Sequence, residues 1–147
     1  MARTVGLATL VAGTLDIMFA IILSLVYGRD PSAMLRYVAS GPFPSATEWG
    51  TAGSATGIMV HFILMAIMAT AYVWFARSRP HLRQMPVRAG VAYGVITYII
   101  MNLIVVPMRF GFPVSPRPIS IASQLFAHVV LVGIPIALIT ARRRLPK

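Results

Sequence analysis

Cysteine is absent from this chain of 147 residues, and acidic residues are scarce, with only three Asp and Glu in total. Without cysteine the protein has no disulfides, no thiolate metal ligands, no thiol nucleophile and no haem attached through Cys. Charged residues of both signs make up only 11% of the chain, whereas soluble domains contain about a quarter. With 58% hydrophobic residues and a mean hydropathy of +0.81, the composition indicates an integral membrane protein.

Four apolar stretches are long enough to cross a bilayer as helices, which takes about 20 residues each. The sequence therefore predicts an all-α fold, an integral membrane antiparallel four-helix bundle. The first stretch could instead be a cleaved signal peptide, but it is longer than the usual apolar core of about 7 to 15 residues and carries Asp16 at its centre. We expect a single transmembrane domain over residues 1–147, with spans at approximately 5–27, 52–76, 87–108 and 119–140.

Two connecting segments carry helix-start signals. Asp30 followed by Pro31 is a good helix start, and residues 31–40 are expected to form a short outer amphipathic helix at the membrane interface. Ser45 and Glu48 are spaced as a capping box, which predicts that the second long helix begins at Ser45, before its apolar part. Asp30 and Glu48 are better explained as helix caps than as catalytic acids.

Basic residues fall mostly on one side of the predicted spans. If both termini are cytoplasmic, nine Lys and Arg residues lie inside and four outside, as the positive-inside rule requires. This placement accounts for the net charge of +10 and argues against nucleic-acid binding. The inner residues are Arg3, Arg77, Arg79, Arg83, Arg88, Arg142, Arg143, Arg144 and Lys147, and the outer ones are Arg29, Arg36, Arg109 and Arg117.

Each predicted span carries one strongly polar side chain: Asp16, His61, Asn102 and His128. Counting about 1.5 Å of helix per residue, all four lie about 9 to 16 Å below the outer boundary, within a turn or two of one another in depth. An unpaired Asp in the middle of a membrane costs about 2.5 to 3.5 kcal/mol, so Asp16 is expected to be protonated or paired, with a histidine as the natural partner. The four side chains could therefore form one intramembrane polar cluster.

Several roles are open to such a cluster. A structural hydrogen bond between helices contributes about 0.6 to 2 kcal/mol, and this role is the one we favour. The alternatives are a proton relay through Asp16 and the histidines, a b-type haem held by His61 and His128, or a divalent metal bound by Asp16 with both histidines. The sequence contains no catalytic triad, phosphate loop or paired carboxylates, which favours a protein that is not an enzyme.

Two pairs of glycines are spaced four residues apart, Gly53 with Gly57 and Gly90 with Gly94. Such spacing leaves one helix face without side chains, so that another helix can approach closely. Gly53, Gly57 and His61 share one line along their helix. We interpret these faces as packing surfaces within the bundle, with homodimerisation as the alternative.

Five motifs are spread over the chain: GTLDIMF (13–19), VASG (38–41), GIMVHF (57–62), VVPM (105–108) and AHVVLVG (127–133). Together they resemble a group of small bacterial inner-membrane proteins. The resemblance covers nearly the whole chain and implies four helices in a bacterial inner membrane, but it brings no assigned activity. We therefore expect a structural or accessory protein that contacts the lipid bilayer, as a subunit of a larger membrane complex or as a homo-oligomer.

Overall fold

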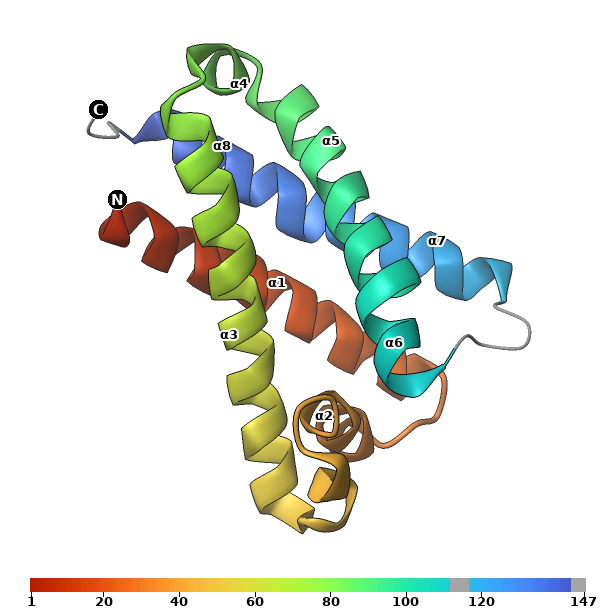
Figure 1. The fold of residues 1–147 in the computed structure, drawn as a ribbon. Coiled ribbons are helices and arrows are strands. Elements are labelled where there is room, and N and C mark those ends of the chain that lie inside the picture. The colour runs from red at the N-terminus through yellow and green to blue at the C-terminus, as the bar shows by residue number, and fades with distance from the viewer. Residues whose placement is uncertain (112–116, 144–147) are drawn as a thin grey trace.

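The computed structural model describes residues 1–111 and 117–143, and within these the chain is almost entirely helical, with no strand. Four helices are long and apolar enough to cross a membrane, which confirms the predicted all-α fold with four long helices. Consecutive long helices run in opposite directions, so that both termini lie at one end of the molecule (Figure 1). The predicted inner residues Arg144 and Lys147 fall outside the described residues. The four helices are α1 (Ala2–Val26), α3 (Gly50–Arg77), Pro86–Phe110 and Pro118–Arg142.

The third and fourth long helices each contain a π-helical segment. Both π segments lie two residues before a proline, η2 before Pro107 and η3 before Pro135. Proline has no backbone N–H, so the α-helical hydrogen-bond pattern cannot continue through it unchanged, and wider turns are one way for the helix to adjust. The segments are α5 (Pro86–Ile99), η2 (Ile100–Val105), α6 (Val106–Phe110), α7 (Pro118–Phe126), η3 (Ala127–Gly133) and α8 (Ile134–Arg142).

Three short helices connect the long ones: α2 (Pro31–Ala39), η1 (Pro44–Glu48) and α4 (Pro80–Gln84). The predicted cap of α2 is confirmed, because the Asp30 carboxylate accepts hydrogen bonds from the backbone N–H groups of Ser32 at 2.9 Å and Ala33 at 3.1 Å. The predicted capping box is wrong. Ser45 and Glu48 belong to the separate 3₁₀ helix η1, and α3 begins only at Gly50, whose φ of +57° breaks the chain direction between them.

Helix α1 and the η3–α8 part of the fourth helix lie side by side in the middle of the molecule (Figure 1). Helix α3 packs on α1, and α5 packs on η3 and α8. Short helix α2 packs on α3 at one end of the molecule, while α4 packs on α8 at the end that carries both termini. This layout decides which polar side chains of the four long helices can meet.

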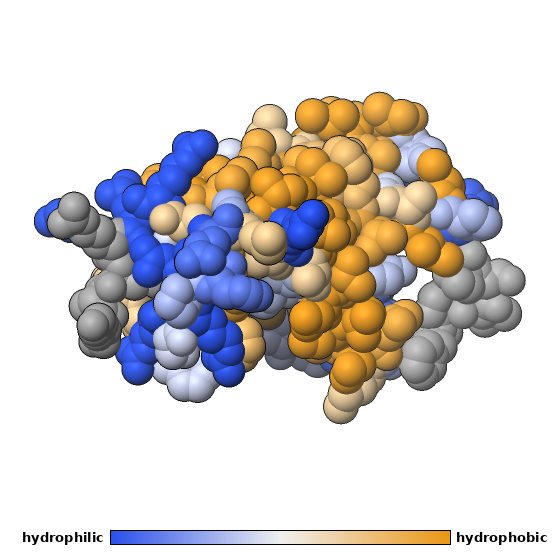
Figure 2. Space-filling model, turned by 90° about the horizontal axis from the view of Figure 1, so that it is seen from above, coloured by the Kyte–Doolittle hydropathy of each residue, from blue (hydrophilic) through white to orange (hydrophobic). Residues whose placement is uncertain are grey.

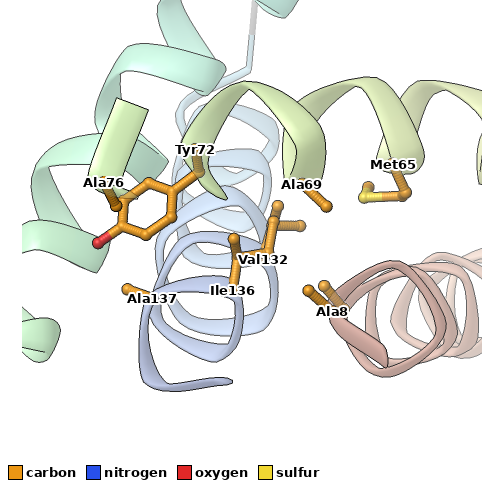
Figure 3. Packing of buried hydrophobic residues seen from close by; sticks show 9 residues of the cluster. Ala8, Met65, Ala69, Tyr72, Ala76, Val132, Ile136 and Ala137 are labelled. Carbon is orange, nitrogen blue, oxygen red and sulfur yellow. The ribbon is translucent and has the colours of Figure 1, made fainter. Parts of the chain in front are cut away.

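The core is built largely from small residues, so the helices come close together. Figure 3 shows α3 facing both α1 and the η3–α8 segment across this core. Large hydrophobic side chains such as Leu10, Val26 and Ile67 point outward and are at least 60% exposed, which is compatible with contact to a lipid bilayer. In the view of Figure 2, hydrophobic residues cover much of the surface. The core cluster is Ala8, Ala12, Met65, Ala69, Tyr72, Ala76, Val132, Ile136 and Ala137.

Candidate functional site

The first glycine pair on α3 faces two short helices: Gly57 lies against α2, and Gly53 lies against η1 and Arg36 of α2. A Cβ atom added at Gly57 would lie 2.7 Å from the backbone carbonyl carbon of Leu35, well inside the 3.4 Å at which ordinary contacts begin. A Cβ atom at Gly53 would collide with the carbonyl oxygen of Ala46. Because backbone atoms cannot rotate away, both positions require glycine. The partners of this face are short helices of the same chain.

The second glycine pair brings the third and fourth long helices together. Added Cβ atoms at Gly94 and Gly90 would lie 2.5 Å from the Cα of Val129 and 2.6 Å from the Cα of Ile134. Gly133 faces them from η3, and a Cβ atom there would lie 2.7 Å from the backbone nitrogen of Gly94. Gly133 has no second glycine four residues away, so the glycine spacing in the sequence did not predict its role.

His61 reaches from α3 to α1, where it contacts both the backbone and Asp16. Its Nε2 lies 2.9 Å from the carbonyl oxygen of Gly13. A carbonyl oxygen only accepts hydrogen bonds, so Nε2 carries the hydrogen. The other ring nitrogen, Nδ1, lies 3.9 Å from Asp16 Oδ2. The proton that keeps this pair neutral therefore resides either on Nδ1 or on the carboxyl group.

Gly13 makes this approach possible. A Cβ atom at Gly13 would lie 2.7 Å from the ring of Phe62, the neighbour of His61 on α3. His61 itself is only 7% exposed, and the Asp16 side chain is 22% exposed. The pair is thus a nearly buried acid and base, joined by the packing of α1 on α3.

His128 belongs to a different network, which joins the third and fourth long helices. The Thr97 hydroxyl donates to the carbonyl oxygen of Gly94 at 3.0 Å, so its oxygen is free to accept from His128 Nδ1–H at 3.2 Å. His128 Nε2 then carries no hydrogen and accepts from the Asn102 side-chain N–H at 3.4 Å. The second N–H of Asn102 lies in reach of the Tyr98 carbonyl oxygen, also at 3.4 Å. This network fixes a neutral His128 with both ring nitrogens in use.

The four predicted polar residues thus meet as two pairs, Asp16 with His61 and Asn102 with His128. Among residues 1–111 and 117–143, no hydrogen bond or ion pair links one pair to the other. The same residues contain no group of three His, Asp or Glu side chains close enough to hold a metal ion, so Asp16, His61 and His128 do not form a joint metal site. Although the sequence places the four side chains at similar depths, they form two separate pairs instead of one cluster.

Arg109, which the sequence analysis counted only as an outer basic residue, holds α2 in place. Its Nε donates to the carbonyl oxygen of Gly41 at 2.8 Å, and its Nη2 donates to that of Ser40 at 2.9 Å. These carbonyl groups directly follow α2, which ends at Ala39, and the C-terminal end of a helix carries partial negative charge that a guanidinium group stabilises. Next to this contact, the rings of Tyr37 and Phe110 stack with centroids 4.5 Å apart. An arginine after a long apolar helix is common, so the sequence gives no sign of this role.

Chemically, the two polar pairs differ. The Asp16–His61 pair can hold or release a proton, whereas the His128 network has no unused ring nitrogen. A shallow surface hollow on the outward face of α3 lies away from both pairs and is lined by Ile63, Ala66, Ile67, Thr70, Ala71 and Trp74. Comparisons of this chain with protein-family models, with curated proteins and with solved structures found no match.

Proposed function

We propose that this chain is a structural or accessory protein of a bacterial inner membrane, a non-enzymatic subunit of a larger membrane complex with both termini cytoplasmic. One observation supports this role above the others: the buried histidines bind helix to helix. His61 ties α3 to the backbone of α1, and His128 ties η3 to α5 and η2. Hydrogen bonds of this kind fix which helices are neighbours in a membrane. The excess of Lys and Arg at the end carrying both termini supports the orientation.

A partner would have to use a surface other than the glycine faces. Those faces already pack against helices of the same chain, so a homodimer through them is disfavoured. The hollow on α3 offers the small side chains of Ala66, Thr70 and Ala71 on an outward face, and small residues are enriched where membrane helices associate. We infer that a partner helix packs against this hollow.

Site-directed photo-cross-linking tests this proposal, because a chain without cysteine accepts a single introduced cysteine as the only labelling site. Ala71→Cys places the cross-linker in the hollow, and Ile22→Cys, at a 53% exposed position on α1, serves as the control. In native membranes we expect a product heavier than the 16.0 kDa chain from Ala71→Cys and not from Ile22→Cys. A product of twice the chain mass identifies a homo-oligomer, and absence of any product at Ala71 contradicts the accessory role.

The Asp16–His61 pair supports a second candidate function, proton transfer within the membrane. The observation in its favour is the second ring nitrogen of His61, which faces the Asp16 carboxyl group instead of a backbone group. In proteoliposomes containing a pH-sensitive dye, Asp16→Asn and His61→Gln should then abolish proton flux. His128→Gln is the matched control, because its network is separate and should leave flux unchanged. Flux at the protein-free level in the unmodified protein excludes this function.

Haem ligation is less favoured by the contacts. A haem held by His61 and His128 would require both Nε2 atoms to leave their present partners, the Gly13 carbonyl group and the Asn102 amide. The visible absorption spectrum of the purified protein tests this directly. A Soret band that disappears in His61→Ala or His128→Ala would overturn the structural interpretation of both histidines.

A further inference from the structure

The end of the molecule that carries α4 and both termini has a strongly basic surface. In Figure 2, which views the molecule from above Figure 1, hydrophilic residues gather towards the left, the side on which both termini lie in Figure 1. All three acidic side chains of the chain lie elsewhere: Asp16 is within α1, Asp30 directly precedes α2, and Glu48 is the last residue of η1. No acidic side chain therefore neutralises these cations. We call this basic region the arginine surface. Its members are Arg77, Arg79, Arg83, Arg88, Arg142 and Arg143.

The arginine side chains use few of their hydrogen-bond donors within the described protein. Arg79 donates to the carbonyl oxygen of Phe75 at 3.2 Å, Arg83 to that of Arg143 at 2.9 Å, and Arg88 contacts a methionine sulfur atom. Each guanidinium group has five N–H donors. Apart from Arg83 Nε, which is buried without a partner in the described residues, most of the remaining donors are available to a ligand at the surface.

The fold concentrates these charges instead of dispersing them. The bond from Arg83 to the Arg143 carbonyl group draws α4 onto the end of α8, so that cations from α3, α4, α5 and α8 share one end of the molecule. Like charges repel appreciably within a screening length of about 8 to 10 Å at moderate salt. Bound anions would relieve this repulsion.

The long apolar helices end at this surface, which places the guanidinium groups at the level of lipid headgroups. Arginine matches phosphate geometry with two parallel hydrogen bonds, and basic sites at helix ends bind acidic lipids. We propose that the arginine surface binds the phosphate groups of anionic phospholipids. This inference does not depend on the accessory function, because it concerns a different surface.

The test measures lipid binding to the purified full chain in neutral detergent by native mass spectrometry. The probes are phosphatidylglycerol and phosphatidylcholine with identical acyl chains. We expect phosphatidylglycerol to bind at least about tenfold more tightly, and each arginine removed to weaken it about fivefold. Arg79→Gln with Arg88→Gln is the main variant, because the side-chain hydrogen bonds of both residues reach only three or four positions along the chain. Arg29→Gln with Arg117→Gln, two exposed arginines elsewhere, is the charge-matched control.

Removing arginines also weakens the signal that orients the chain, so a second variant retains the charge. Arg79→Lys with Arg88→Lys should insert normally and still bind phosphatidylglycerol less tightly than the unmodified protein. Equal binding of the two lipids overturns the proposal. So does an unchanged phosphatidylglycerol affinity in both variants of Arg79 and Arg88, the glutamine pair and the lysine pair. Displacement of the lipid by an equal concentration of inorganic phosphate also overturns it, since the surface would then recognise a free anion.

Discussion

Gly94→Ala is the most direct test of how the third and fourth long helices pack. The new Cβ atom would lie 2.5 Å from the Val129 Cα, and reaching an ordinary contact of 3.4 Å requires the helices to separate by about 0.9 Å. Backbone overpacking of this kind costs about 1 to 3 kcal/mol. The same separation stretches the bonds of His128 to Thr97, at 3.2 Å, and to Asn102, at 3.4 Å, beyond hydrogen-bonding range. With about 0.6 kcal/mol for each bond in a membrane, we expect a total loss of about 2 to 4 kcal/mol.

The assay is reversible unfolding in mixed micelles with increasing denaturing detergent, followed by helical circular dichroism. Gly6→Ala is the matched control, because Gly6 lies in α1 and a Cβ atom there would meet nothing within 4 Å. Alanine is the better helix former by about 0.5 to 1 kcal/mol, so the control should be neutral or slightly more stable. If Gly94→Ala unfolds at the same detergent concentration as Gly6→Ala, the close contact between these helices is not present in the protein.

Substitutions at three further residues test individual contacts. Arg109→Gln removes the charge that caps α2, and it should loosen that helix by about 1 to 2 kcal/mol, seen as faster hydrogen exchange over residues 35–41. Thr97→Val leaves the His128 Nδ1–H without an acceptor in a buried site and should cost about 1 to 3 kcal/mol in the same unfolding assay, whereas Thr97→Ser should restore most of it. Asp30→Ala removes the α2 cap and should cost about 1 kcal/mol, with Asp30→Asn close to the unmodified protein. Hydrogen exchange in Arg109→Gln that equals that of the unmodified protein would contradict the Arg109 contact. Equal stability of Thr97→Val and Thr97→Ser, or of Asp30→Ala and Asp30→Asn, would contradict the contact of that residue.

The sequence was sufficient to predict four long apolar helices, because length and hydropathy alone decide whether a helix can cross a membrane. The cap at Asp30 could also be predicted, since it depends only on neighbouring residues. The capping box at Ser45 and Glu48 failed for the opposite reason. There the chain changes direction at Gly50, whose φ is +57°, and the backbone of η1 packs against Gly53, so that the segment forms a separate helix.

The pairing of polar side chains was beyond the sequence. Helix rise gives the depth of Asp16 and His128 in the bundle, but not the direction in which each points or the order of the helices around the bundle. The π segments add to the difficulty, because a wider turn rotates every later side chain of that helix relative to an α-helical projection. Asn102 and His128 both lie within such segments. Thr97 was missed because a hydroxyl residue in an apolar helix is ordinary.

The bond from Arg109 to the carbonyl groups of Ser40 and Gly41 has a consequence for biogenesis. Arg109 lies 69 positions after Ser40 and 68 after Gly41, with α3 and most of the third long helix between them. Chains emerge from the ribosome N-terminus first, so α2 is synthesised well before the residue that fastens it. During synthesis α2 can dock on α3 through the glycine face, but its end stays unfastened until Arg109 has emerged. This end of the protein can therefore be completed only after the third long helix has been synthesised.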